Sequence, residues 1–497
     1  MLKIKTFLKY INIMIGLILF TFINQLNGLD VSPGNILFTP ITFGPQGGGD
    51  SYTRLIGSEG EIINEWSHNS SAATTAYLLK DSTLLCPITI EDPYMVGSAY
   101  GGKIVKYSWD GEIIWQYDYS NENYLQHHDI EPMPNGNILL IAWDRRTYLE
   151  GISAGRVNLE SEMWPDKIVE LEPIGQDSAE VVWEWKFWDH LIQDVDPNLP
   201  NYGVISEHPE LIDINIGSMP MAAMGIADWT HLNSIDYNED LDQIVISSRN
   251  MNEFYIIDHS TTTEEAAGHS GGNSGMGGDI IYRWGNPMNY QRGTVEDKRL
   301  VGQHDVNWIE SGYPNSGNLI IFNNGSITSF GQNNTLSSVI EISTPVDSSG
   351  FYEIDSLNAY GPEEVVWSFQ SDFFSHIMSG AKRLLNGNTL VTVATEMRIF
   401  EVTSSGNVVW DYIHEEVGQT SISKAHKYNL DYLSPDCSSL GDVDQNCNVD
   451  ILDIILVVNY ILNLTDLDAV QINLADLNNS EDVNIQDVTL LVDLILN

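Results

Sequence analysis

Hydrophobic and polar residues alternate in short runs along most of the chain, and one run recurs six times. Each copy has an acidic residue or glycine, then two or three aliphatic residues, then alternating aromatic residues. β-Branched and aromatic residues in this alternation are typical of β-strands. The six predicted strands are GEIINEW (60–66), GEIIWQY (111–117), EVVWEW (180–185), DIIYRW (279–284), EVVWSF (364–369) and GNVVWDY (406–412).

A second predicted strand precedes each copy, most often after a Gly-Asn turn. These strands are PGNILF at Pro33, DSTLLCPI at Asp81, NGNILLIAW at Asn135, LDQIVISS at Leu241, SGNLIIF at Ser316 and NGNTLVTV at Asn386. Two such strands in every roughly 50–100 residues, with little helical periodicity, are typical of β-propeller blades. We therefore predict an all-β, six-bladed β-propeller over residues 29–433, with residues 189–228 forming a long loop on one face.

The pattern changes after Pro435 to two copies of a polar loop followed by an apolar helix. Each loop has oxygen-bearing side chains at positions 1, 3, 5, 9 and 12 and a backbone carbonyl at position 7, which is the ligand spacing for Ca²⁺. The tail is therefore predicted to be a small α-helical domain with paired calcium loops. The predicted ligands are Asp442, Asp444, Asn446, Asn448, Asp450 and Asp453, and Asp476, Asn478, Ser480, Asp482, Asn484 and Asp487.

The two loops resemble those of type I dockerins, over residues 438–497. The resemblance implies calcium as a cofactor and a cohesin-type scaffold protein as partner. The glycine usual at loop position 6 is replaced by Cys447 and Glu481, which changes the turn and leaves the calcium affinity open. A disulfide between Cys437 and Cys447 would fix the first loop. The apolar runs after both loops argue against a disordered acidic tail.

The first residues have the layout of a secretory signal. Lys3, Lys5 and Lys9 precede an apolar run from Ile11 to Ile23. We predict a signal peptide at residues 1–28, with an uncleaved anchor as the alternative, and no other span through a membrane. The protein is then secreted, periplasmic or on the surface of a bacterial cell.

The charge of the chain limits which molecules it can bind, and the cysteines indicate where a thiol is buried. The chain has 69 Asp and Glu against 22 Lys and Arg, a formal net charge of −47. Such a field repels phosphate backbones, so nucleic acid is not an expected partner, and it favours solubility outside the cell. Of the three cysteines, Cys86 lies in an apolar run and is predicted to be a buried thiol.

Four histidines precede the second predicted strand of successive blades by 8 to 13 residues. Equivalent positions in a propeller converge on the central channel, so these imidazoles are predicted to share one site. They could bind a metal ion, stabilise an anion, or act as nucleophile and acid or base. The histidines are His128, His231, His304 and His376.

The residues beside these histidines help to decide among metal binding, anion stabilisation and catalysis. Asp129 and Asp305 directly follow two of the histidines, but neighbours in a strand point to opposite faces, which weakens the metal interpretation. Arg249 lies at the far end of a predicted strand. It has either a structural role or a role in binding an anionic substrate.

Several segments resemble arylsulfate sulfotransferases, over most of residues 50–415. They are HHDIEPMPNGNILLIAW from His127, DWTHLNSIDYNEDLDQIVISSRN from Asp228, IIYRWGNP from Ile280, GQHDVNWI from Gly302 and SGAKRLLNGNTLVTVATEMRIFEVTSSGNVVWDY from Ser379. The resemblance implies a six-bladed propeller that moves a sulfuryl group from a phenolic sulfate ester to another phenol or an alcohol. No nucleotide donor or cofactor is implied for the transfer.

The family chemistry implies a sulfohistidine intermediate, with other histidines and an arginine holding the sulfate. His231 and His304 match family histidines, and His376 falls where the nucleophile is expected. The family arginine expected after the FNNG segment is absent from residues 322–335, so either another arginine replaces it or the activity differs. The predicted catalytic residues are His376, His304, His231 and His128, and the predicted substrate-binding residues are Arg249, Asn233 and Arg283.

Two other functions fit the same pattern. One is a propeller without catalytic activity that binds glycans or a partner protein and is tethered by the tail. The other is a hydrolase or lyase of a sulfated polysaccharide, with water or sugar in place of the phenol.

Overall fold

The computed structural model of the chain divides into two compact units, Met1–Asn429 and Leu430–Asn497. The predicted signal peptide and the pair Cys437 and Cys447 lie outside the residues that it describes. The described residues are 31–41, 51–74, 76–217, 219, 226–325, 336–354, 358–415, 421–433, 440–444, 449–462, 464–467, 469–480 and 482–496.

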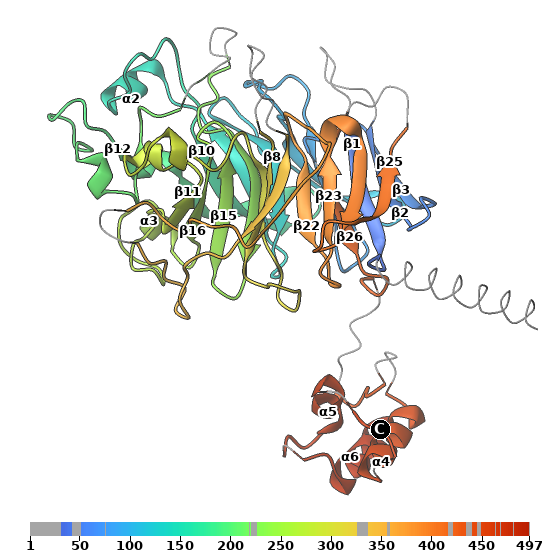
Figure 1. The fold of residues 1–497 in the computed structure, drawn as a ribbon. Helices are drawn as coiled ribbons and strands as arrows, with labels where there is room; N and C mark the ends of the chain where they lie inside the picture. The colour runs from blue at the N-terminus through green and yellow to red at the C-terminus, as the bar shows by residue number, and fades with distance from the viewer. Residues whose placement is uncertain are drawn as a thin grey trace, which may run out of the picture. The chain divides into compact units, whose positions relative to one another are not determined.

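The first unit is a six-bladed β-propeller, and each blade is a four-stranded antiparallel sheet (Figure 1). From the third blade to the sixth and on to the first, the first-named strands of neighbouring blades contact one another, so they line the central channel. The blades are β26 (Ser421–Tyr428), β1 (Asn35–Ile41), β2 (Ser51–Ile56) and β3 (Ile62–His68); β4 (Tyr77–Leu78), β5 (Leu84–Thr89), β6 (Gly102–Tyr107) and β7 (Ile113–Asp118); β8 (Tyr124–Pro132), β9 (Ile138–Asp144), β10 (Asp166–Ile174) and β11 (Ser178–Lys186); β14 (Leu232–Asn238), β15 (Gln243–Ser248), β16 (Glu253–Asp258) and β17 (Tyr282–Trp284); β18 (His304–Trp308), β19 (Leu319–Asn323), β20 (Ser338–Ile342) and β21 (Trp367–Gln370); β22 (Gly380–Arg383), β23 (Thr389–Val393), β24 (Arg398–Val402) and β25 (Val408–Ile413).

The first blade joins the two ends of the propeller. Strand β26 from the end of the unit pairs antiparallel with β1 from its beginning, with Asn35 opposite Tyr428 and Ile41 opposite Ser421. This pairing leaves no open edge between the first and last blades, which would otherwise offer unpaired backbone groups.

The predicted strands are the second and fourth strands of each blade. Glycines form the turns before three of the second strands. At Gly136, for example, φ is +87°, a conformation that glycine adopts without strain, and its N–H donates to Met133 to close the turn. The first and third strands of each blade were not predicted.

The repeated aromatic residues of the outermost strands connect the blades. In each blade one tryptophan indole N–H donates to an oxygen of the following blade, and the sixth blade returns to the first. Because a buried indole needs such a partner, the repeat fixes the spacing of neighbouring blades. The pairs are Trp66 with Ser108, Trp115 with Ser178, Trp183 with Thr261, Trp284 with Pro362, Trp367 with Ser404 and Trp410 with Ser58.

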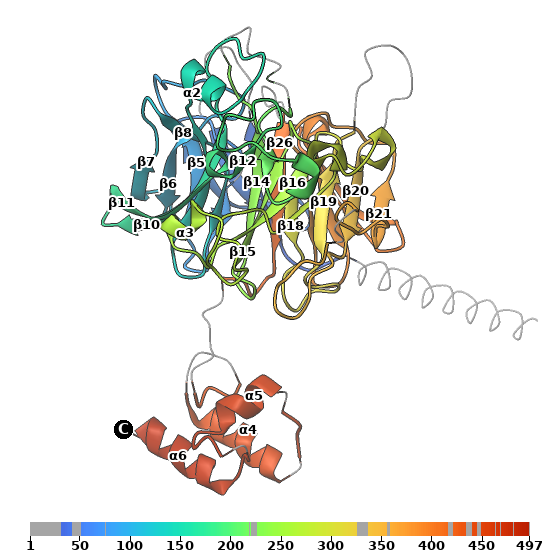
Figure 2. The ribbon, with the colours of Figure 1, turned by 90° about the vertical axis from the view of Figure 1, so that its left-hand side faces the viewer.

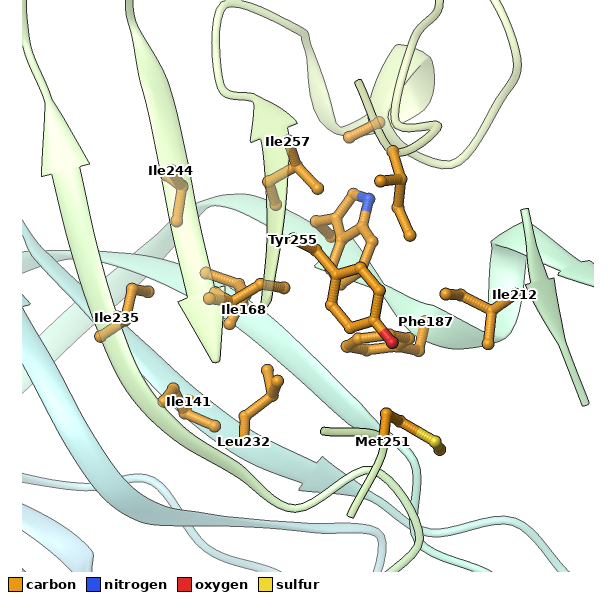
Figure 3. Packing of buried hydrophobic residues seen from close by; sticks show 14 of the residues in the cluster. Ile141, Ile168, Phe187, Ile212, Leu232, Ile235, Ile244, Met251, Tyr255 and Ile257 are labelled. Atoms are coloured by element: carbon orange, nitrogen blue, oxygen red, sulfur yellow. The ribbon is translucent and has the colours of Figure 1, made fainter. Parts of the chain in front are cut away.

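Hydrophobic side chains fill the space between neighbouring blades. Figure 3 shows one such cluster, in which Ile141 and Ile168 of the third blade pack near Ile244 and Ile257 of the fourth. Burying each such side chain contributes about 1.5–3 kcal/mol. Cys86 is fully buried in the second blade, as predicted.

The connections carry short helices. The segment predicted as a long loop at 189–228 contains part of η1 together with β12, η2 and β13, and β12 pairs parallel with β13. This segment follows the outermost strand β11 and precedes the channel strand β14 (Figure 2). The connecting elements are α2 (Tyr148–Ser153), η1 (Phe187–His190), β12 (Leu191–Ile192), η2 (Ile205–Glu207), β13 (Ile212–Asp213), α3 (Thr263–Ala266), η4 (Pro287–Tyr290), η5 (Val295–Asp297) and η6 (Ala394–Glu396).

The second unit is helical. It contains α4 (Ile451–Ile461), α5 (Ala469–Ala475) and α6 (Ile485–Leu496), and α4 and α6 begin where the apolar runs predict helices. Val443, Val457 and Leu491 are buried in its core. In neither unit does a described helix combine the length and hydrophobicity needed to cross a bilayer.

Candidate active site in the central channel

Three of the predicted histidines and Arg249 lie together on consecutive blades. His128 lies in β8, His231 directly precedes β14, and His304 begins β18. The ring centroids of His128 and His231 are 4.8 Å apart. His304 and Arg249 are close enough to lower the pKa of His128, which burial lowers most. We call these four residues the histidine cluster.

A chain of hydrogen bonds sets the proton positions on His128. Nε2 of His127 lies 2.7 Å from Oδ1 of Asp166, and its Nδ1 lies 2.7 Å from Nδ1 of His128. A carboxylate only accepts, so Nε2 of His127 donates and its Nδ1 accepts from Nδ1–H of His128. The lone pair of neutral His128 is therefore on Nε2, which has no hydrogen-bond partner among the described residues.

Asp166 is held rigidly at the start of this chain. Its Oδ2 accepts from the hydroxyl of Thr230 and from the backbone N–H of Leu232, both at 2.7 Å. Asp166 lies in β10 of the third blade, whereas both donors come from the fourth. The chain of hydrogen bonds therefore also joins two blades.

His231 has a carboxylate partner of its own. Nδ1 of His231 lies 2.5 Å from Oδ2 of Asp228, and the indole of Trp143 donates to the other oxygen at 3.1 Å. Burial alone would raise the pKa of Asp228, but His231, His127 and the hydrogen bond from Trp143 together outweigh burial and lower the pKa. Nε2 of His231 has no partner within the described part of the chain.

His304 uses both ring nitrogens. The amide nitrogen of Asn324 donates to the carbonyls of Ser375 and Met378, so its oxygen accepts from Nδ1 of His304 at 2.8 Å. Nε2 of His304 accepts from the backbone N–H of Met378 at 3.1 Å. Burial lowers the pKa of His304 to about 3, so the ring is neutral.

Arg249 supplies the cation of the cluster. Its backbone N–H donates to the carbonyl of His231, and burial lowers its guanidinium pKa. Its side chain makes no hydrogen bond or ion pair with any residue that the structure describes. The guanidinium is thus available to an anion.

Nearby Asn233 donates to the carbonyl of Gln303 at 2.7 Å, and its buried side-chain oxygen has no described partner.

The other two predicted site residues lie elsewhere. His376 is exposed, in the segment between β21 and β22 that is anchored through Ser375 and Met378 to Asn324, and its ring stacks on Phe374. No described contact joins it to the cluster. Residues 326–335, which include most of the segment where the family arginine was sought, lie outside the described residues.

Arg283 does not belong to this site, which corrects the prediction that it binds substrate. It is fully buried in β17, the outermost strand of its blade, and donates to both carboxylate oxygens of Glu253. Its remaining bonds go to the carbonyls of Pro209 and Leu211. The partners of this arginine therefore lie in its own blade and in the 189–228 segment.

A second set of charges lies beside the cluster on the same strands. Nζ of Lys424 in β26 lies 2.7 Å from Oδ2 of Asp129 and 3.2 Å from Oδ1 of Asp305. The hydroxyl of Tyr77 donates to Asp129 at 2.9 Å. Burial raises the pKa of nearby Asp236 to about 6 despite the attraction of lysines. We call Lys424, Asp129, Asp305, Tyr77 and Asp236 the lysine network.

Comparison with known proteins identifies this propeller. The sequence model of the arylsulfotransferase (ASST) family matches residues 49–432, which include every residue of the histidine cluster. The chain belongs to the arylsulfotransferase family. This membership supports sulfuryl transfer as the general class of reaction. The comparison with curated proteins returned no match.

Three solved structures with a similar fold are only distantly related to this chain. A Bacteroides caccae protein of unknown function is 10% identical with a TM-score of 0.41, covering 80% of this chain and 99% of its own. A putative 6-phosphogluconolactonase from Bacteroides fragilis is 12% identical with a TM-score of 0.37, covering 80% and 98%. Virginiamycin B lyase from Staphylococcus aureus is 13% identical with a TM-score of 0.34, covering 78% and 88%.

Sequence reasoning missed three members of the candidate site, namely His127, Asp166 and Asp228. Two of them stood inside quoted motifs, as the first histidine of HHD and the aspartate of DWTH. A carboxylate three positions before a histidine is a usable signal for a pair that orients the ring. Asp166 carried no such signal because only the fold brings β10 to His127.

The second unit brings some of the predicted calcium ligands together. Oxygen atoms of Asp442, Asp444 and Asp453 lie within 4.8 Å of one another. In both loops the last aspartate, Asp453 or Asp487, accepts backbone N–H groups from loop positions 3 and 9. Asp450, Asp476, Asn478, Ser480, Asp482 and Asn484 are described around these two loops, whereas Asn446 and Asn448 lie outside the described residues.

Proposed function

We propose that the protein is an exported arylsulfate sulfotransferase that transfers a sulfuryl group from a phenolic sulfate ester to a phenol or alcohol. The observation that carries the proposal is the histidine cluster. A guanidinium and two imidazole Nε2 atoms, on Arg249, His231 and His128, lack described partners in an otherwise buried polar site. Buried polar groups are normally paired, so these point to a ligand. The guanidinium fits an anionic sulfate, and the imidazole Nε2 atoms fit a group that carries a hydrogen, such as an acceptor hydroxyl.

The proposed reaction has two displacements. An imidazole nitrogen attacks sulfur, the N–S bond forms, and the phenolate leaves with the electrons of the broken S–O bond. The acceptor oxygen then attacks the same sulfur, the N–S bond breaks, and the acceptor's hydroxyl proton passes to a neighbouring base. The Arg249 guanidinium would stabilise the charge on the sulfuryl oxygens. The lone pair on Nε2 of His128 is placed to take the proton.

His376 is the proposed nucleophile. It falls where the family resemblance implies the nucleophile. It also comes two positions before Met378 in the chain, and the backbone N–H of Met378 donates to Nε2 of His304. His128 is the competing candidate, since its lone pair faces away from the His127 contact. Neither candidate needs a cofactor.

The test combines turnover with trapping. A 4-nitrophenyl sulfate donor and a phenol acceptor are supplied to the wild type, to His376→Ala and to His208→Ala, a control at a half-buried histidine of the 189–228 segment. We expect release of 4-nitrophenol to be lost only in His376→Ala. Mass spectrometry of peptides after donor alone should place one sulfuryl group on His376. A sulfuryl group on His128 would move the nucleophile there, and binding without release would favour a propeller without catalytic activity.

We further propose that the helical unit binds calcium and docks the enzyme onto a cohesin-type scaffold protein outside the cell. The converging carboxylates of Asp442, Asp444 and Asp453 support this, because carboxylate oxygens gathered at one point are the ligands that Ca²⁺ takes. The buried side-chain oxygen of Asn478 in the second loop has no described hydrogen-bond partner, as expected of a ligand atom. Export is supported by the apolar segment after Lys9.

Calcium titration of the full-length protein tests the tail. Asp453→Asn should weaken binding at the first loop, whereas Asp466→Asn, an exposed aspartate between the loops, should leave it unchanged. Equal affinities in the two variants would contradict the calcium proposal without affecting the sulfotransferase proposal.

A further inference from the structure

A second histidine group lies between the outer parts of the third and fourth blades, away from the channel strands. His190 ends η1 after β11, His269 follows α3, and Asp279 lies shortly before β17. One ligand atom from each of the three lies within 4.8 Å of the others. The proposed sulfuryl transfer does not use any of them.

The hydrogen bonds of His190 demand a cation at this point. Its Nε2 lies 2.9 Å from the carbonyl oxygen of Ala266, which only accepts, so Nε2 carries a hydrogen. Nδ1 of a neutral ring then has a lone pair, yet it lies 2.8 Å from Oδ1 of Asp279. Two electron-rich atoms at that distance repel, and either a proton or a metal ion must lie between them.

The contact of His269, the third residue of the group, with Asp279 favours a metal ion over a proton. Nδ1 of His269 lies 2.7 Å from the same oxygen of Asp279, although the His269 side chain is 63% exposed. An exposed hydrogen bond to a carboxylate contributes little against the entropy of ordering a side chain. Two imidazoles and one carboxylate converging on one point are instead a ligand set for zinc and similar ions.

The surroundings resemble those of a metal centre. A ligating histidine usually donates its other N–H to a backbone carbonyl, as His190 does to Ala266. Trp185 stacks on the His190 ring at 5.5 Å, and Gly278 passes so close to His190 and Ala266 that a side chain there would collide with both. The buried half of the group is therefore held in a fixed orientation.

We propose that His190, His269 and Asp279 bind a divalent transition-metal ion of the zinc type. Donor atoms about 2.0–2.1 Å from a tetrahedral zinc lie about 3.3 Å apart, so the contacts of 2.7 and 2.8 Å need to open by only about half an ångström. The fourth position is left to water or a ligand. His269 also lines a cavity of about 490 Å³ with Trp188, Tyr202 and His208, which gives an ion access.

The site would act as a clamp. His190 begins the long segment between β11 and β14, and His269 and Asp279 belong to the connection between β16 and β17 of the next blade. An ion bound by all three would join these two insertions and stabilise the rim that surrounds the cavity. Nothing in this inference depends on the sulfotransferase proposal.

The test uses full-length protein freed of metal with a chelator and titrated with Co²⁺ in excess Ca²⁺, which keeps oxygen-rich loops filled. We expect the visible absorption of tetrahedral Co²⁺ at one equivalent. His269→Ala should weaken binding by about 100-fold or more. His208→Ala removes a half-buried histidine of the same cavity, whose side chain bonds to Glu210, and should bind like the wild type.

Two results would overturn the inference. One is a wild type without the tetrahedral absorption, which would mean that a proton bridges His190 and Asp279. The other is equal Co²⁺ affinity in His269→Ala and the wild type. Because His269 is exposed and its loss leaves the His190–Asp279 pair in place, the variant is expected to fold, and circular dichroism checks this.

Discussion

The histidine cluster and the lysine network lie side by side on channel strands. They differ in whether the buried cation is paired with carboxylates. His128 is followed by Asp129 and His304 by Asp305, and each pair sends one residue to each group. In the lysine network, one buried cation faces two carboxylates. In the cluster, the Arg249 guanidinium has no described partner. Charges matched within the chain maintain the fold, whereas unmatched donors are available to a ligand.

The largest effect is expected from Lys424→Met. The substitution leaves Asp129 and Asp305 facing one another without a cation, and breaking a buried pair typically costs 3–5 kcal/mol. Urea unfolding measures the loss of unfolding free energy. Lys103→Met is the control, because its pair with Asp118 is partly exposed and should cost less than about 1 kcal/mol. Equal effects of the two substitutions would mean that the lysine network is not a structural element.

Arg249→Leu should reduce turnover and leave stability nearly unchanged, in contrast to the loss of stability expected from Lys424→Met. Removing the cation proposed to hold the sulfuryl oxygens should lower kcat by about 10²–10³-fold. Stability should change by less than about 1 kcal/mol because no described ion pair is broken. Arg145→Leu, at an exposed arginine paired with Glu162, is the matched control and should keep full activity. A large loss of stability without loss of turnover would assign Arg249 a structural role.

The strands that carry these two groups could be predicted only in part from the sequence. The second and fourth strands of each blade were found because their aliphatic and aromatic runs repeat after turns. The first strands were not, since segments such as HHDIEP are polar where they line the channel, and β4 has only two residues. The pairing of β26 with β1 joins residues from opposite ends of the propeller, and no local pattern indicates it.

The residues of the candidate site could likewise be predicted only in part. Regular spacing brought out His128, His231 and His304, and Arg249 was found at the end of its strand. The same spacing also selected His376, whose segment leaves it exposed, and the choice of Arg283 failed because it lies on an outermost strand. Whether a polar residue faces the channel or a neighbouring blade depends on contacts between distant segments, which spacing does not encode.

Acid should affect the two groups in opposite directions. Burial lowers the pKa of His304 from 6.5 to about 3, so below pH 6.5 the unfolded chain binds a proton that the folded protein does not. Stability is lost as the pH falls, by about 2.7 kcal/mol two pH units below 6.5. Burial raises the pKa of Asp236 from 3.8 to about 6, so its protonation stabilises the folded protein as the pH falls through that range.

Unfolding free energies measured from pH 7 to pH 4 separate these contributions. His304→Gln should make the loss on acidification shallower, whereas Asp236→Asn should make it steeper. Parallel curves for the two variants and the wild type would show that neither group changes its proton affinity on folding.

The smallest effect is expected from Asp166→Asn, which alters the cluster without removing any of its members. An asparagine that turns its oxygen to Thr230 and Leu232 presents its N–H₂ to Nε2 of His127, which must then accept. The proton of His127 moves to Nδ1, and the lone pair of His128 is no longer held on Nε2. We expect kcat to fall by about 10–100-fold, within the range for loss of a positioned acid or base. Nitrogen-15 NMR of the histidine rings should show the change of tautomer, and an unchanged His128 signal with full turnover would separate this hydrogen-bond chain from catalysis.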